Sequence, residues 1–250
     1  MLKFNAMLLI FVSAINKPPQ NMDLKKQAAQ KAAALIKDQS RIGLGAGSTM
    51  AYMVDFLKLR TFEGLEVEVL SSSFDTRKLL AHQGFVVREM SEVDRVDQYF
   101  DGCDQFDRNL HALKSGGGVH THEKLLAAMA EEFIIVADES KWVDRFDEKF
   151  PLVVELIPEA LLYVEAEMRQ LFDISSIAVR FDDQSEAPVK TANGNLLLDI
   201  WFRQWNSLVA INVLVKNVAG VLETSLFYDM AKKAVVGTAA GAVVVERSAN

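Results

Sequence analysis

The chain has 250 residues, half of them hydrophobic, which suffices for one sizeable core and a small second domain. Acidic residues outnumber basic ones by 34 to 27, so the net charge of -7 argues against general binding to nucleic acid or to an anionic membrane. The one cysteine, Cys103, excludes an intrachain disulfide and a thiolate zinc cluster, and it fits a cytoplasmic protein.

Residues 1–22 are interpreted as an N-terminal extension outside the fold. An apolar run follows Lys3 and ends at Ile15, and it is too short to span a bilayer. A secretory signal with a cleavage site near Ser13 is one alternative. A true start at Met22, just before the first predicted helix, is another.

An alternation of strands and helices is predicted from residue 23 to residue 137. Asp23 is a suitable N-cap, and apolar residues at helical spacing follow it. The predicted helices are residues 23–37, 50–59, 75–83 and 121–130, and the predicted strands are residues 41–44, 65–70, 85–90, 96–100 and 133–137. Such alternation indicates an α/β fold whose mostly parallel sheet has helices on both faces.

The rhythm changes near Phe150. Strands at 152–157, 176–181 and 196–202 and helices at 159–172 and 208–216 predict a small α+β domain, residues 150–221. The main α/β domain would then consist of residues 23–149 and 222–250. Strands at 221–227 and 234–238 are expected to rejoin the main sheet.

A glycine-rich turn, residues 45–49, joins the first predicted strand to the next helix. Gly45 and Gly47 allow a tight turn and close approach of a ligand, and Ser48 and Thr49 add hydroxyl donors at a helix N-terminus. This pattern favours a phosphate cradle, although a plain turn between strand and helix has the same residues. It is not a Walker loop, because the Gly-Lys-Ser/Thr ending is missing.

Two acids, Asp101 and Asp104, follow another predicted strand. Ligands of α/β sheets bind beyond the carboxyl ends of the strands, where carboxylates hold sugar hydroxyls or move protons between oxygens. A solvated acidic turn is the alternative. Lys141 follows the strand at 133–137, so it is either a phosphate partner or a solvated lysine.

Residues 114–124 combine a cation, a glycine cluster and a carboxylate. Gly116 and Gly117 let the backbone bend or approach a ligand, Lys114 precedes them, and Glu123 follows in a helix. An enolising reaction needs a base for the carbon-bound proton and a positive group near the oxygen that becomes anionic. Glu123 placed for the helix dipole is the alternative.

The four histidines carry less information. His120 and His122 with nearby acids raise the option of a metal site, but no third ligand has a diagnostic spacing. We interpret both as residues of a loop and a helix start. His82 and His111 are expected at the surface.

These segments, in this order, resemble the A-type ribose-5-phosphate isomerases. That family carries a Gly-x-Gly-Ser-Thr turn, a Ser-Ser-Ser turn, Asp-Gly-Ala-Asp-Glu, a Lys with a glycine cluster and Thr-Arg-Glu-Lys, and Ala-Asp-x-Ser-Lys. The matching positions here are residues 45–49, 71–73, 101–105, 114–124 and 137–141. The likeness extends over about residues 23–245, and five motifs in register make it specific.

The resemblance implies a Rossmann-like main domain with a small lid inserted late, no metal or organic cofactor, and a homodimer or dimer of dimers. It implies that ribose 5-phosphate and ribulose 5-phosphate are the substrate and product. Glu123 falls on the family's general base and Lys114 on its oxyanion stabiliser. Asp101 and Asp104 fall on the acids that handle ring opening and the sugar hydroxyls. Ser48, Thr49, Lys25 and Lys141 fall on or near the phosphate-binding positions.

The sequence also departs from the family pattern. Gln105 replaces a Glu, Cys103 an Ala, His122 an Arg, and Ala46 a Thr. These changes bear on rate and affinity rather than on the type of reaction. The rival readings are a sugar-phosphate deaminase of the same fold and a non-catalytic sugar-phosphate sensor. Residues 1–22 are too short and too weakly basic to supply the DNA-binding segment of such a regulator.

Overall fold

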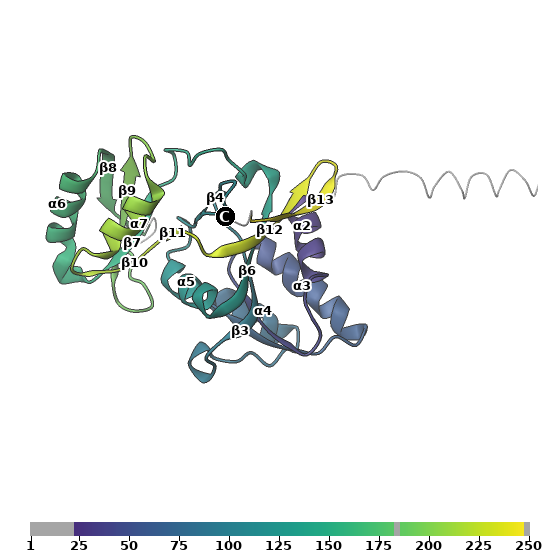
Figure 1. Ribbon diagram of the computed structural model, residues 1–250. Coiled ribbons are helices and arrows are strands. Elements are labelled where there is room, and N and C mark those ends of the chain that lie inside the picture. Colours follow the sequence, from purple (N-terminus) through teal and green to yellow (C-terminus); the bar gives the residue numbers. More distant parts are fainter. Residues whose placement is uncertain (1–22, 183–185, 248–250) are drawn as a thin grey trace, which may run out of the picture.

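A computed structural model describes residues 23–182 and 186–247 of the chain. Its main sheet has six strands in the order β13-β12-β6-β3-β1-β2, which are parallel except for the edge strand β13 (Figure 1). Their bounds are β1 Ser40–Leu44, β2 Val67–Ser71, β3 Val96–Asp101, β6 Ala130–Asp138, β12 Ala231–Thr238 and β13 Gly241–Glu246.

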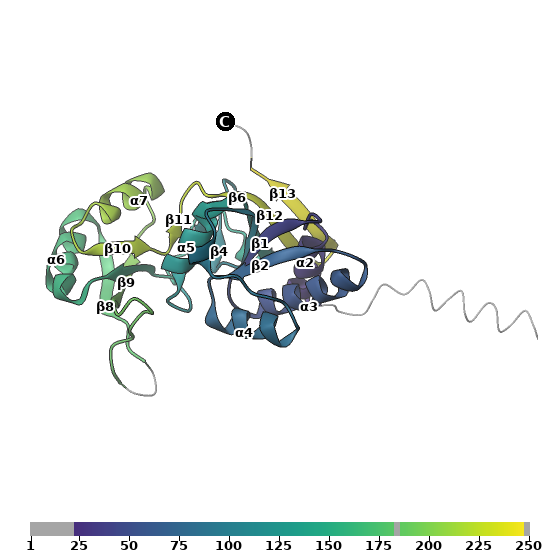
Figure 2. The same cartoon turned by 90° about the horizontal axis from the view of Figure 1, so that it is seen from below.

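Helices cover both faces of this sheet, as the alternating pattern predicts. The helices α2 (Leu24–Ala33), α3 (Ser48–Phe62) and α4 (Phe74–His82) contribute to the core on one face. The opposite face carries α5 (His120–Met129), whose Leu126 and Ala127 pack into a second core (Figure 2). The N-cap prediction is confirmed, because the Asp23 carboxylate accepts a hydrogen bond from the backbone N–H of Lys25.

A second, four-stranded antiparallel sheet lies in the late part of the chain, in the order β10-β7-β9-β8. Its strands are β7 Leu152–Leu156, β8 Ile174–Val179, β9 Leu196–Phe202 and β10 Val221–Thr224. A 3-10 turn η3 (Pro158–Ala160) precedes α6 (Leu161–Leu171), and α6 and α7 (Leu208–Lys216) pack on one face of this sheet in a third core. We call this sheet and its two helices the small unit.

A short three-stranded sheet joins the two parts of the molecule. It has the order β11-β5-β4, with β4 Gln105–Phe106, β5 Ala112–Leu113 and β11 Leu226–Phe227. No helix in the described part of the chain is long and apolar enough to cross a bilayer.

The structure corrects several sequence-based expectations. Residues 85–90 form no strand; Val87 makes a single isolated bridge to Val69, and a 3-10 turn η1 (Met90–Glu92) follows. Val86 is 81% exposed, whereas Phe85 and Val87 are partly buried and pack against the first core. His111 is buried rather than at the surface, and its ring stacks on Tyr228.

The segment 221–227 does not rejoin the main sheet. It divides into β10, which pairs with β7 in the small unit, and β11, which pairs with β5. An apolar run shows that a strand is buried but not which strand it pairs with. The segment 234–238 does join the main sheet, as part of β12 beside β6. The division into residues 23–149 and 222–250 against 150–221 stays a prediction, and the extension 1–22 lies outside the described residues.

Candidate active site

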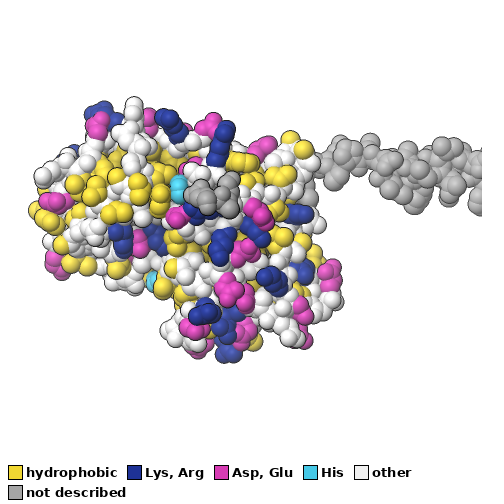
Figure 3. Space-filling view, in the orientation of Figure 1, with side chains coloured by type: hydrophobic (Ala, Val, Ile, Leu, Met, Phe, Trp, Pro, Cys, Tyr) yellow, Lys and Arg dark blue, Asp and Glu magenta, His cyan; other side chains and the backbone are white. Residues whose placement is uncertain are grey.

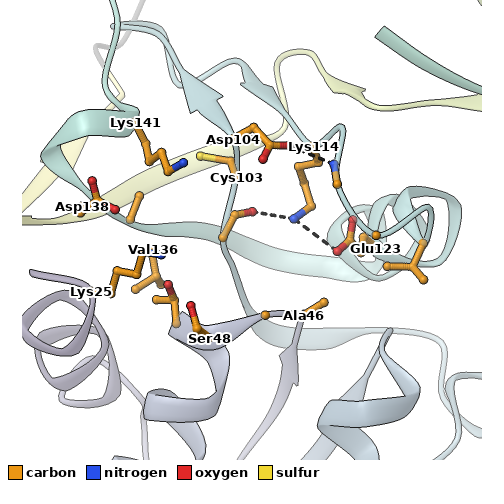
Figure 4. A pocket seen from close by; sticks show the side chains of 17 residues that line it. Lys25, Ala46, Ser48, Cys103, Asp104, Lys114, Glu123, Val136, Asp138 and Lys141 are labelled. Carbon is orange, nitrogen blue, oxygen red and sulfur yellow. Dashed lines mark hydrogen bonds and ion pairs between the residues drawn. The ribbon is translucent and has the colours of Figure 1, made fainter. Parts of the chain in front are cut away.

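A cavity of about 360 Å³ opens at the carboxyl ends of β1, β3 and β6, three adjacent strands of the main sheet (Figure 4). This volume lies in the range of small-molecule sites. Ten of the twelve residues predicted for the site line it: Lys25, Gly47, Ser48, Thr49, Asp104, Lys114, Gly116, Gly117, Glu123 and Lys141. The other two, Gly45 and Asp101, are not among its lining residues.

Glu123 projects from the first turn of α5 into this cavity and is only 3% exposed. Its Oε1 lies 3.4 Å from Lys114 Nζ, while its Oε2 is buried without a hydrogen-bond partner in the structure. Burial raises the pKa of Glu123, Lys114 lowers it and Asp101 raises it again, with a net pKa of about 8. This pKa lies well above the ordinary value of 4.5 for a glutamate carboxyl.

Lys114 is the buried cation of the site. Its Nζ donates to the Gly102 carbonyl at 2.5 Å and pairs with Asp101 Oδ2 at 2.9 Å. Burial lowers the pKa of Lys114, but Asp101 and Glu123 outweigh it, so the pKa is raised above its usual value. The ammonium group therefore stays charged beside the Glu123 carboxyl.

Asp101 lies behind Lys114 and has no exposed surface. Its carboxylate accepts hydrogen bonds from the Tyr99 hydroxyl and from the backbone N–H groups of Gly102 at 2.7 Å and Ala46 at 3.2 Å. A Cβ on Gly45 would lie 1.8 Å from Asp101 Cγ. Only glycine at position 45 leaves room for the Asp101 carboxylate. Sequence reasoning missed Tyr99, because an aromatic residue inside a predicted strand gives no indication of a role in the site.

Asp104 shapes the glycine cluster. Its Oδ2 accepts hydrogen bonds from the backbone N–H groups of Ser115 at 2.6 Å and Gly116 at 3.1 Å. Gly117 and Gly118 then adopt positive φ angles of 68° and 65°, which favour glycine. The Lys114 side chain and the cluster are therefore held against the same acidic loop.

Two lysines and one carboxylate, Asp138, line the opposite side of the cavity. In Figure 4, Lys25 and Lys141 lie on the side of the pocket away from Glu123. Gly47, the residue before α3, offers no side-chain cap, so the first N–H groups of the helix lack that partner at the border of the cavity. Two lysines and a helix N-terminus are suited to a phosphate group.

The four residues that depart from the family pattern do not all lie at the cavity. Ala46 and Cys103 line the cavity, whereas Gln105 and His122 do not. Gln105 is buried and its Oε1 accepts from the Asp147 backbone N–H. Burial raises the pKa of Cys103 to about 12, so its thiol stays protonated.

The histidine metal option gains no third ligand from the structure. His120 is completely buried, and its Nε2 donates to the Glu223 carbonyl at 3.4 Å. Residues 23–182 and 186–247 hold no group of three His, Cys, Asp or Glu side chains placed to bind a metal ion. His120 is at the start of α5, as expected for a helix-start residue.

Comparison with known proteins gives a consistent result. A family model described as ribose 5-phosphate isomerase A (phosphoriboisomerase A) matches residues 68–241. The chain is 38% identical over 221 residues to the ribose-5-phosphate isomerase A of Methanothermobacter thermautotrophicus, covering 88% of this chain and 96% of that protein.

Solved structures resemble the fold over most of its length. The ribose 5-phosphate isomerase A of Methanocaldococcus jannaschii superposes with a TM-score of 0.83 at 34% identity, covering 90% of this chain and 98% of that one. A D-ribose-5-phosphate isomerase in complex with phospho-erythronic acid gives a TM-score of 0.84 at 31% identity, with coverage of 90% and 98%. Sequence and fold therefore agree over nearly the whole of these proteins, and this chain belongs to the ribose 5-phosphate isomerase A family.

Proposed function

We propose that this protein interconverts D-ribose 5-phosphate and D-ribulose 5-phosphate, a step of the non-oxidative pentose phosphate pathway. The observation that carries the proposal is the buried pair of Glu123 and Lys114 in a cavity whose far side carries Lys25 and Lys141. A carboxylate with one unpartnered oxygen is a base, and an ammonium beside it stabilises a neighbouring oxyanion. An aldose–ketose isomerisation needs both groups.

In this proposal Glu123 takes the proton from C2 of the open-chain aldose phosphate and returns it to C1. The C2–H bond electrons form the enediolate double bond, and the carbonyl oxygen becomes anionic beside Lys114. The C2 hydroxyl proton passes to the anionic C1 oxygen and the electrons of that O–H bond form the C2 carbonyl, while the double-bond electrons take up the carbon-bound proton at C1. The two exchanges balance, so no oxidant or reductant is consumed. A pKa near 8 for Glu123 suits a group that must both accept and release a proton near neutral pH.

We assign different roles to the two aspartates. Asp104 lines the cavity, which supports contact with the sugar hydroxyls and help with ring opening. Asp101 has no exposed surface and pairs with Lys114, which supports a positioning role instead. The phosphate and the sugar would be held by Lys25, Ser48, Thr49 and Lys141. Gly45 and Gly47 would shape the turn, and Gly116 and Gly117 would shape the glycine cluster.

Turnover of ribose 5-phosphate by the purified protein, after treatment with a metal chelator, tests the proposal. We expect ribulose 5-phosphate to form at an undiminished rate after chelation. A folded protein that binds the sugar phosphate without turnover would instead indicate a sensor. Release of ammonia from an amino-sugar phosphate would indicate the deaminase. Loss of activity on chelation, restored by metal, would revive the histidine metal site.

We further propose a homodimer or dimer of dimers in the cytoplasm. Hydrophobic side chains gather on the surface over the small unit (Figure 3), where Leu162 is 80% exposed and Tyr163 and Val209 are each 51% exposed. Exposed apolar surface of this kind supports association between chains. Light scattering on the purified protein gives the number of chains, and a monomer across the working concentration range would contradict the proposal.

A further inference from the structure

Glu123 lies in the first turn of α5. The residues on either side of Glu123 in this turn make hydrogen bonds and an ion pair to the small unit. Thr121 donates its hydroxyl to the Glu155 carboxylate on β7. Lys124 Nζ pairs with Glu223 on β10 at 2.9 Å, and His120 bonds the carbonyl of the same residue. Glu123 itself turns the other way, toward Lys114. The helix that presents the base is thus attached to a different sheet from the one that ends at the cavity.

Glu155 is the most buried charge in this attachment, with 1% exposure. One carboxylate oxygen, Oε2, accepts from Thr121. The other, Oε1, accepts from Thr191 Oγ1 at 2.8 Å, Asn193 Nδ2 at 3.0 Å and Asn195 Nδ2 at 2.9 Å. A buried carboxylate is costly unless donors satisfy it, and here four neutral donors do so. Burial raises the pKa of Glu155, but together these hydrogen bonds lower it by more than burial raises it. The net pKa is therefore below its usual value, and the group stays ionised.

The backbone of Glu155 is held as firmly as its side chain. It lies on an inner strand of the small sheet, opposite Leu197 of β9 on one side and Glu223 of β10 on the other. Its neighbours Val154 and Leu156 point into the third core, so alternation along β7 turns Glu155 to the other face of the sheet. Hydrogen bonds to ionised groups are about twice as strong as neutral ones. Glu155 therefore gives Thr121 a rigid, charged partner.

We propose that Glu155 is a positioning residue of the isomerisation: through Thr121 it fixes the first turn of α5, and so it holds the Glu123 carboxylate in its buried place against Lys114. The small unit is then part of the catalytic apparatus and more than a cover over the cavity. This inference rests on the proposed role of Glu123 as the base.

Thr121→Val is the sharpest test, because valine keeps the β-branched shape and removes the hydroxyl. We expect kcat to fall about tenfold to a hundredfold, since small misplacements of catalytic groups cost up to that much, while KM changes less than about threefold. Thr121→Ser retains the hydroxyl and should restore most of kcat. Glu155→Gln should reproduce the loss of kcat. If the Glu155→Gln protein does not fold, the comparison of Thr121→Val with Thr121→Ser is the test.

Two further readouts separate positioning from simple stabilisation. The Glu123 carboxyl is titrated by carbon NMR in wild type and in Thr121→Val, and it should titrate at lower pH in the variant, because a loosened first turn admits water. Ser175→Ala is the matched control: Ser175 lies on β8 and donates to the Trp201 carbonyl at 3.0 Å without a bond to α5. This control should keep the wild-type kcat and Glu123 titration.

A Thr121→Val protein with a lower melting temperature but unchanged kcat and an unchanged Glu123 titration would overturn the inference. Wild-type protein without isomerase activity would overturn the proposed function instead. In that case the titration still decides whether Glu155 and Thr121 hold Glu123 in place, because it needs no turnover.

Discussion

Replacing Glu123 with glutamine changes both the rate and the pH dependence of stability, and each follows from the site. Glutamine keeps the size of the side chain, which is 3% exposed, but it cannot accept the substrate proton. Loss of a positioned general base costs about 10² to 10⁴ in rate, which corresponds to roughly 3 to 5 kcal/mol in the barrier. We expect kcat to fall by that factor while the fold is kept.

The same substitution is expected to increase stability, although it lowers the rate. The pKa of Glu123 is raised from 4.5 to about 8 in the folded chain, mainly by burial. Between these pH values the folded state holds a proton that the unfolded state has released, so the free energy of unfolding falls as the pH rises. At about 1.4 kcal/mol per pH unit, the full shift is on the order of 5 kcal/mol. Glutamine removes this loss, so the variant should gain stability relative to wild type as the pH increases.

Urea denaturation of both proteins at pH 5.5 and pH 8.5 measures this difference, and the isomerase assay is run on the same samples. We expect the stability of Glu123→Gln minus that of wild type to be larger at pH 8.5. We also expect kcat/KM of wild type to rise with pH through about 8, because the free enzyme must lose the Glu123 proton. A stability difference that does not vary with pH would refute the raised pKa, and wild-type turnover in the variant would remove Glu123 from the mechanism.

Other substitutions test the groups around the base. Lys114→Met should lower kcat at least about a hundredfold. It should also lower the melting temperature, because it leaves the buried Asp101 charge unpaired at a cost of about 3 to 5 kcal/mol; an unchanged melting temperature would contradict the ion pair. Gly45→Ala should cost about 1 to 3 kcal/mol in thermal denaturation and reduce turnover, because its Cβ would overlap the Asp101 carboxylate. Lys25→Met and Lys141→Met should raise KM for ribose 5-phosphate about tenfold or more with a smaller change in kcat, and should weaken inhibition by inorganic phosphate. Equal losses in kcat and unchanged KM would place these lysines away from the phosphate.

Local patterns were sufficient for most of the elements and indicated residues that line one cavity. The helix at 208–216 and the strand at 196–202 agree with α7 and β9 at both ends, since hydrophobic periodicity and local caps act within a few residues. The polar turns that follow β1, β3 and β6 border one cavity, because the carboxyl ends of parallel strands lie at one edge of a sheet. The resemblance of five motifs in register then identified the family, which the comparisons confirm.

Other features depend on residues far apart in the sequence. The partner of the 221–227 segment is set by tertiary contacts, because a strand's own pattern does not specify its neighbour. The raised pKa of Glu123 results from burial and from the charge of Asp101, which together outweigh the opposing charge of Lys114. The four donors of Glu155 come from segments 34 to 40 residues away. The sequence alone therefore determined most of the elements and the family, whereas only the folded chain decided which charges are buried together, since burial and pairing depend on packing between distant segments.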